Sequence, residues 1–478
     1  MKNRHIIALL FSALLAILLF GFNPIGLELT ASKVCAIGCF MIACWVTEAM
    51  PMPVVALIPL IFFPLFGIAK MDDIAASYAN PVIFLFLGGF MIGLAIEKWN
   101  LHKRIALNIV RLTGTAGNRI VLGFIMATGF LSMWLSNTAT TMMMYPIAMS
   151  VIQVMEKNGK ERETRNLSVC LLLAIAYASN FGGIATIIGT PPNVAYVSFL
   201  EKHNGYAFSF SDWMMLCMPI SLLLLATLYI VMTRILVPVR SGADAMVKDV
   251  IATEIKEIGK LSKAEKRVLF VFVLTAVLWI TRDILNNAQQ TIKLDDTMIA
   301  VFGGIMLFII PSGAEENKPL LVWDDTKRMA WGILLLFGGG IALADQLGKA
   351  GLIQALGEAM AGFVTPGFFL ILIVTLVSIF LSEVMSNVEQ VIVFAPVVAG
   401  IADALHFNPL QIGIAMTLGA SCAGMLPMGT PPNAIVFASG RLKLKHMLLK
   451  GFAMNLISAL LITLFCWFLL PVLVKTIR

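Results

Sequence analysis

Two polar motifs interrupt apolar stretches of this 478-residue chain, at WLSNTATTMMMYP (134–146) and VMSNVEQVIVFAP (384–396). Each motif places a serine beside an asparagine, with a further serine four residues earlier, on the same face of a helix. The polar residues in question are Ser132, Ser136, Asn137, Ser382, Ser386 and Asn387. Burying polar groups without partners is costly, so the presence of two such motifs indicates a functional role. Hydroxyl and amide oxygens are hard, neutral ligands, which suit an alkali cation better than zinc or copper.

A second pair of motifs, IGTPPN (188–193) and MGTPPN (428–433), lies within apolar segments of about 30 residues. Proline removes an amide donor and clashes with the preceding turn, so we expect the helix to unwind at 189–192 and at 429–432. Unwound backbone survives in a membrane only where it is buried or lines a water-filled cavity. Its carbonyls then suit a cation, and the N-termini of the half-helices suit an anion. The alternatives are a simple proline kink and polar contacts that hold helices together; the duplication argues against both.

The elements that must position these motifs are membrane helices. Hydrophobic residues make up 59% of the chain, charged residues only 13%, and the mean hydropathy is +0.92; soluble domains have roughly 25% charged residues. We predict an all-α polytopic membrane protein with about 11 transmembrane helices and two re-entrant hairpins. The first segment, 1–31, reads as a transmembrane helix, because its apolar region is long and no signal-peptidase site follows. The net charge of +7 is explained by cytoplasmic loops, so we expect no nucleic-acid partner.

The distribution of basic residues predicts the topology. Lys and Arg flank 120–155 on both sides, whereas few flank 366–400, so the two hairpins should enter from opposite faces. FLFLGGFMIGLA (84–95) also matches LLLFGGGIALAD (334–345). We therefore predict two inverted repeats, a pattern typical of secondary transporters, with the N-terminus cytoplasmic and the C-terminus outside. The predicted divisions are 1–31 (first helix), 32–238 (first repeat, hairpin 120–155, broken helix 167–200), 239–267 (cytoplasmic linker) and 268–478 (second repeat, hairpin 366–400, broken helix 411–438).

Other chemistries find little support in the sequence. The seven cysteines lie in apolar segments without a CxxC pair, and the five histidines fall at or near segment ends. No Asp/His or Ser/His pairing appears at membrane depth, which argues against an intramembrane enzyme. We expect neither catalytic residues nor an organic cofactor.

Taken together, the paired SNT-type and TPPN-type motifs resemble the divalent anion/sodium symporter family, the INDY-type di- and tricarboxylate transporters, over nearly the whole chain. The resemblance implies a homodimer with a scaffold, an elevator-like transport domain and two or more co-transported Na⁺ ions; we expect it in the bacterial inner membrane. One implied sodium site would use Ser132, Ser136, Asn137 and the Gly189 carbonyl, and the other Ser382, Ser386, Asn387 and the Gly429 carbonyl. The implied substrate site comprises Asn137, Thr138, Thr190, Asn387, Val388 and Thr430.

One position departs from that family. Val388 stands where many dicarboxylate carriers have Thr, and a lost hydrogen bond of about 1–3 kcal/mol would shift preference among succinate-, citrate- and sulfate-like anions. Glu383 and Glu389 lie near the second motif as cation or proton partners, or in contact with solvent. Neither the tips nor the TPPN loops contain Arg or Lys, so dipoles and co-bound cations must balance the charge of an anion.

We therefore predict a sodium-coupled symporter that imports dicarboxylates such as succinate, malate or fumarate. The alternatives are a carboxylate exchanger, a sodium/sulfate or sodium/citrate symporter, and a membrane sensor that does not transport.

Overall fold

The regular structure of the described residues is helical. The computed structural model describes residues 2–23, 26–114, 117–158, 161–205, 208–238, 244–289, 291–314, 318–361 and 365–477. Within these ranges the only β-type contact is an isolated bridge between Pro311 and Pro319. Part of the predicted linker, 239–243, lies outside the described residues.

The helices follow one another along the whole chain. In order they are α1 (Lys2–Phe22), α2 (Leu29–Val46), α3 (Met52–Val55), α4 (Ile58–Leu65), α5 (Met71–Tyr78), α6 (Pro81–Lys98), α7 (Leu101–Thr113), α8 (Asn118–Ser132), α9 (Asn137–Asn158), α10 (Glu161–Gly183), η1 (Ile187–Gly189), α11 (Pro191–Asn204), α12 (Phe210–Ile230), η2 (Val231–Leu236), α13 (Asp244–Ile258), α14 (Lys263–Ala288), α15 (Asp296–Ile309), η3 (Trp323–Arg328), α16 (Trp331–Lys349), α17 (Leu352–Ala361), α18 (Phe368–Ser382), α19 (Asn387–Ala404), α20 (Pro409–Ala420), α21 (Pro431–Phe437), α22 (Leu444–Leu464), η4 (Phe465–Leu469) and α23 (Leu470–Ile477).

Nine helical segments in the described part of the chain are long and apolar enough to cross a membrane, and shorter apolar helices accompany them. The multi-pass membrane architecture is therefore confirmed, while the count of eleven crossings stays a prediction. The apolar segment 52–69, whose length suits one membrane helix, instead forms two short helices, α3 and α4. Pro59 at the start of α4 cannot donate a backbone hydrogen bond to the preceding turn.

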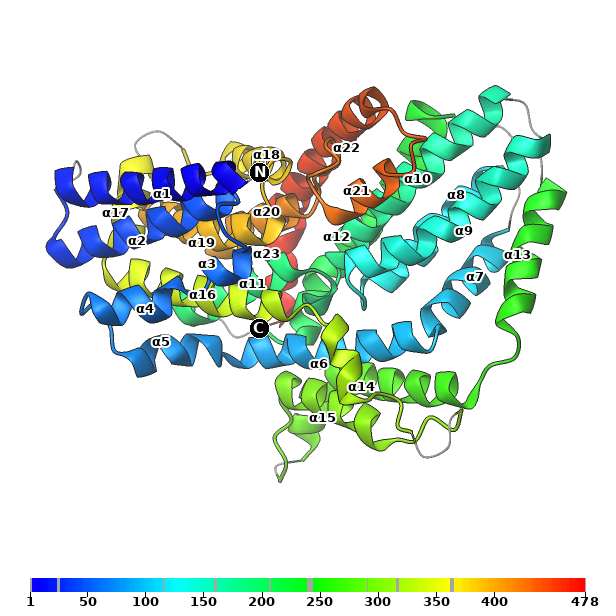
Figure 1. Ribbon diagram of the computed structural model, residues 1–478, viewed down its shortest axis with the longest axis horizontal. Helices are drawn as coiled ribbons and strands as arrows, with labels where there is room; N and C mark the ends of the chain where they lie inside the picture. The colour runs from blue at the N-terminus through cyan, green and yellow to red at the C-terminus, as the bar shows by residue number, and fades with distance from the viewer. Residues whose placement is uncertain are drawn as a thin grey trace.

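The two predicted hairpins occupy different parts of the molecule. The first hairpin consists of α8 and α9 and the second of α18 and α19, and Figure 1 shows the second pair to the left of the first. Both α8 and α9 pack against α10, and in the same manner α18 and α19 pack against α20. Each broken helix is thus held by the hairpin that precedes it in the sequence.

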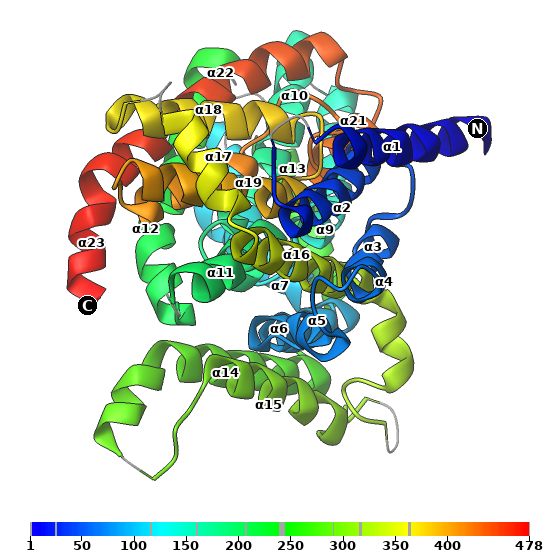
Figure 2. The same ribbon diagram turned by 90° about the vertical axis from the view of Figure 1, so that its left-hand side faces the viewer.

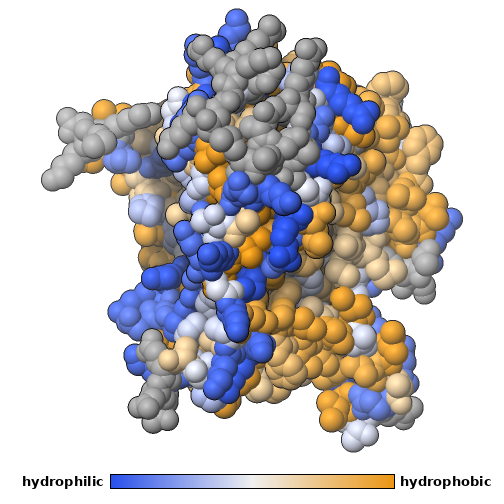
Figure 3. Space-filling model, turned by 90° about the vertical axis from the view of Figure 1, so that its right-hand side faces the viewer, coloured by the Kyte–Doolittle hydropathy of each residue, from blue (hydrophilic) through white to orange (hydrophobic). Residues whose placement is uncertain are grey.

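A separate layer and a polar end complete the molecule. The helices α14 and α15 form a layer below the others in Figure 2, where α15 packs against α6. The end seen in Figure 3 carries a band of hydrophilic side chains bordered by hydrophobic surface. This pattern is expected where a water-exposed end meets sides that face lipid.

Candidate functional site

Each Ser-Asn motif marks a break between two helices. α8 ends at Ser132 and α9 begins at Asn137, while α18 ends at Ser382 and α19 begins at Asn387. The prediction that the serines of each pair share one helix face was wrong, because the backbone leaves the helix between them. Ser136 instead accepts a hydrogen bond from the Ala139 amide, at 3.2 Å, in the first turn of α9.

The helices containing the TPPN motifs are also broken, but earlier than expected. α10 ends at Gly183 and α11 begins at Pro191, with η1 as a single turn between them; α20 ends at Ala420 and α21 begins at Pro431. The predicted breaks at 189–192 and 429–432 therefore lie too far along the chain. Proline is well tolerated at the first helical position, where its missing N–H has no intrahelical partner to lose. The prolines start the second half-helix, and the unwound segment precedes them.

Oxygen atoms from three predicted ligands converge at the first break. The Ser132 hydroxyl donates to Asn137 Oδ1 at 2.7 Å. A methyl group on Gly183 would lie 2.4 Å from Asn137 Oδ1 and 3.1 Å from the Gly189 carbonyl oxygen, and one on Gly189 would lie 3.0 Å from the Ser132 carbonyl oxygen. Only glycine permits this close approach at positions 183 and 189. The result is a close cluster of neutral oxygen atoms, a ligand type suited to an alkali cation.

Asn180 on α10 joins the two halves, and the sequence reasoning missed it. Asn137 Nδ2 lies 3.4 Å from Asn180 Oδ1 and 3.5 Å from Thr190 Oγ1, and Asn180 Nδ2 donates to Thr430 Oγ1 at 3.2 Å. Thr190 and Thr430 are the residues that precede α11 and α21. The signal was a third Ser-Asn pair, Ser179–Asn180, inside an apolar helix. This pair has no copy in the second half, so the duplication of motifs does not reveal it.

The second break is built around a carboxylate. Glu383 is 3% exposed and accepts hydrogen bonds from the backbone amides of Gly424, Met425 and Leu426, at 2.7–2.8 Å, and from Asn455 Nδ2 at 2.7 Å. A methyl group on Gly429 would lie 2.8 Å from Glu383 Oε2. The charge of this carboxylate is thus stabilised by the amides of the unwound segment.

The predicted residues of the second break are less tightly bonded than those of the first. Ser382 donates to the Ala420 carbonyl at 2.6 Å. The Asn387 side chain is half-buried and makes no hydrogen bond within the described structure, while Val388 is buried; Thr138, in the first half, is half-buried.

The suggestion that Glu383 and Glu389 contact solvent was wrong, because both are buried. Glu389 is 1% exposed, and its Oε1 has no hydrogen-bond partner among the described residues. The helix α19 packs against α11, α16, α17 and α20, and these tertiary contacts cannot be predicted from the sequence alone.

The site has the architecture of a membrane transporter: two breaks in helix hairpins face two broken helices across a polar centre. Within the described residues, no group of three or more His, Cys, Asp or Glu side chains could hold a metal ion.

The family described as "Sodium:sulfate symporter transmembrane region" matches residues 2–474, and the chain belongs to it. This confirms the resemblance stated above and identifies a transporter rather than an enzyme.

Proteins of known name agree over almost the entire length. The chain is 38% identical over 476 residues to the "Sodium-dependent dicarboxylate transporter SdcS" of Staphylococcus saprophyticus, covering 98% of this chain and 92% of that protein. It is 37% identical to the protein of the same name from Staphylococcus aureus strain USA300, with the same coverage.

Two solved structures share the fold at low sequence identity. The YdaH transporter of Alcanivorax borkumensis superposes with a TM-score of 0.57 at 13% identity, over 84% of this chain and 87% of that one. MtrF of Neisseria gonorrhoeae gives a TM-score of 0.57 at 14% identity, over 83% of each chain. These likenesses concern the fold alone.

Proposed function

We propose that this protein is a sodium-coupled symporter that imports dicarboxylates such as succinate, malate or fumarate. The relatives that match nearly the whole chain carry the name of sodium-dependent dicarboxylate transporters. The single observation that carries the proposal is the close cluster of neutral oxygen atoms contributed by Ser132, Asn137 and Gly189.

Asn137 is the residue through which cation and anion are coupled. An asparagine amide offers an acceptor oxygen and two N–H donors. In the proposed site Oδ1 faces the sodium ion, while Nδ2 points to Asn180 and Thr190, where a substrate carboxylate would compete for the donors. Sodium bound at Oδ1 orients the amide, so that the donors are presented to the anion.

The second sodium ion is proposed at the break that contains Ser382, Ser386, Asn387 and the Gly429 carbonyl. The substrate lies between the two tips, within reach of Asn137, Thr138, Thr190, Asn387, Val388 and Thr430. Thr190 and Thr430 already share the Asn180 network, which supports one site common to both halves.

The proposal extends to the arrangement of the two halves, the movement of the transport domain and the assembly of the protein. The equivalent packing of α8 and α9 on α10 and of α18 and α19 on α20 supports two inverted repeats. We further propose an elevator-type movement of the transport domain, a homodimer, and a location in the bacterial inner membrane with the N-terminus cytoplasmic. These features follow the family resemblance.

Val388 supports a second candidate substrate class. Its buried isopropyl group offers no hydrogen-bond donor at the second tip, which favours anions that do not need a hydroxyl there, such as citrate or sulfate.

Radiolabelled uptake into proteoliposomes tests the proposal. Succinate should accumulate when a Na⁺ gradient is imposed, poorly with Li⁺ and not with choline at fixed pH. Uptake that is equal in choline would overturn sodium coupling, and rapid succinate counterflow without Na⁺ would show an exchanger. Citrate and sulfate as competitors distinguish the substrate classes.

A further inference from the structure

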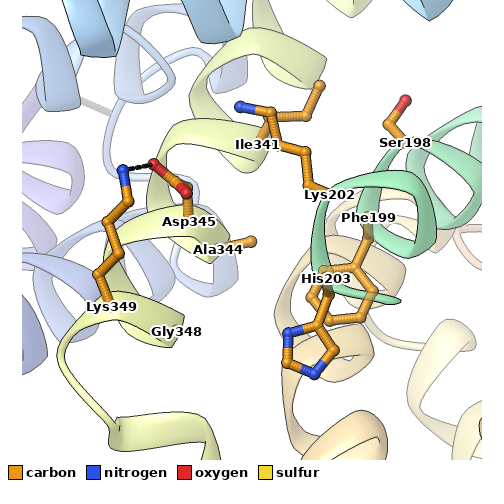
Figure 4. Close-up of a pocket in the computed structure, with 9 residues that line it drawn as sticks. All are labelled: Ser198, Phe199, Lys202, His203, Ile341, Ala344, Asp345, Gly348 and Lys349. Carbon is orange, nitrogen blue, oxygen red and sulfur yellow. Dashed lines mark hydrogen bonds and ion pairs between the residues drawn. The ribbon is translucent and has the colours of Figure 1, made fainter. Parts of the chain in front are cut away.

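A cavity of about 280 Å³ lies between the C-terminal turns of α11 and α16, away from the proposed tips. Figure 4 shows its walls: one side comes from α11 and the other from α16. Sites for small molecules typically measure about 300–1,000 Å³, so this cavity suits a small solute.

The cavity presents hydrogen-bond donors and positive charge. Lys202 Nζ donates to the hydroxyl of Ser77 on α5 at 3.0 Å, a neutral partner that leaves two N–H donors free. The carboxylates of Asp345 and Glu201 act on Lys202 electrostatically, without a direct ion pair among the described residues. Lys349 on the opposite wall pairs with Asp345 at 2.8 Å. Ser198, also in the lining, is buried, and its hydroxyl has no partner among the described residues.

The remaining titratable group in the lining is His203, whose Nε2 lies 3.2 Å from a carboxylate oxygen of Asp403 on α19. Asp403 already engages the histidine, and Asp345 already engages Lys349. Lys202 is therefore the charge best placed to receive an anion from solution.

The floor of the cavity leads toward the proposed substrate site. A second, narrow space of about 10 Å³ continues inward between α11, α16 and α19. A methyl group on Gly340 would lie 2.8 Å from Ile392 Cγ2, so these two residues close the floor. Ala195 and Ile392, which line this space, each follow a proposed substrate residue, Thr190 and Asn387, by five positions, or about 7.5 Å along a helix.

We propose that this cavity is an outer vestibule, in which Lys202 collects the dicarboxylate before the floor between α11, α16 and α19 opens. The inference rests on the proposed function and on the proposed topology, which places the C-terminal ends of α11 and α16 outside. A lysine at the mouth of a closed path raises the local concentration of an anion and its rate of arrival. Charges at the rim of a site act mainly on association and on its salt dependence.

Initial rates of succinate uptake by intact cells, where the substrate reaches only the outer face, test the vestibule. At low ionic strength and fixed Na⁺, Lys202→Gln should raise KM about threefold to tenfold, with the maximal rate unchanged. Added choline chloride should shrink the difference, because salt screens the charge. Lys202→Arg should behave as the unmodified protein, and inside-out vesicles should show no change in KM.

Two further variants separate charge from packing. Ser77→Ala removes the hydrogen-bond partner of Lys202 but leaves its charge, so KM should stay unchanged. Asp345→Asn releases Lys349 and should lower KM, an effect that misfolding cannot imitate. If Ser77→Ala reproduces Lys202→Gln, Lys202 acts as a tether between α5 and α11 and the vestibule is wrong. An unchanged KM in Lys202→Gln likewise overturns it, whereas loss of sodium-dependent uptake in the unmodified protein overturns the proposed function itself.

Discussion

At the scale of single residues, the two asparagines of the copied motifs sit in different surroundings. Asn137 accepts a hydrogen bond from Ser132 and contacts Asn180 and Thr190, whereas the side chain of Asn387 makes no hydrogen bond within the described part of the chain. Asn387 is therefore free to respond to ligand, while Asn137 also holds structure together. The repeats copy the residue types but not their bonding.

That difference predicts how aspartate at each position behaves. Asn137→Asp and Asn387→Asp should both abolish succinate uptake, because each loses two donors and brings a negative charge to the anion site. Only Asn137→Asp should lower the melting temperature in detergent, since it leaves Asn180 and Thr190 without a donor, at about 1–3 kcal/mol. Asn108→Asp, on the amphipathic helix α7, is the control. Normal transport by Asn137→Asp would refute the shared two-tip site.

At the scale of elements, buried side chains hold the unwound segment between α20 and α21, among them Glu383, Asn433 and Asn455. Glu383 binds three consecutive amides there, and Asn455 on α22 binds the same carboxylate. At the matching place in the first half stands Met133, and a different contact closes that break: Thr186 Oγ1 donates to the Met133 carbonyl at 2.5 Å. The two breaks share one device, because Asn193 and Asn433 donate to carbonyls of the unwound segment in their own half. They differ in the contact between that segment and the preceding hairpin.

Glu383→Gln should therefore destabilise the second break selectively. The change replaces a carboxylate by an amide whose NH₂ faces backbone donors, at a cost of about 1–3 kcal/mol. We expect a lower melting temperature and a higher Na⁺ concentration for half-maximal uptake, because Glu383 Oε2 lies beside Gly429. Glu358→Gln, on the exposed surface of α17, is the matched control. An unchanged sodium dependence in Glu383→Gln would show that the carboxylate does not support the second cation site.

The sequence predicted that the helices are interrupted at these motifs, but it did not predict which side chains form hydrogen bonds there. Apolar length, proline and duplicated motifs indicate where a membrane helix is interrupted, because these are local properties of the chain. They do not reveal that Thr190 and Thr430 end the unwound segments, or that Asn180 connects them, since such contacts depend on how α10 and α21 pack. The paired serines show the same limit: helical spacing applies only while the helix continues.

At the scale of the whole molecule, two short helices that the apolar pattern does not reveal lie at opposite ends. Figure 1 places α13, in the linker between the halves, at one end and α17, just before the second hairpin, at the other. Lys103 on α7 pairs with Glu254 on α13 at 2.8 Å, and Arg104 bonds backbone carbonyls of the following segment. The linker is thus docked against α7, at the end where basic residues gather.

The separation of α13 and α17 gives the last prediction, which concerns topology. Basic loops stay in the cytoplasm, so a cysteine replacing Thr253 on α13 should react with a membrane-impermeant maleimide only after the cells are opened. A cysteine replacing Ala355 on α17 should react in intact cells; both positions are exposed. The unmodified protein gives the background, because two of its seven cysteines are half-buried and five are buried. Labelling of both positions from the same side would contradict the inverted repeats. An even number of membrane crossings would then separate α13 from α17, and the two hairpins could not enter from opposite faces.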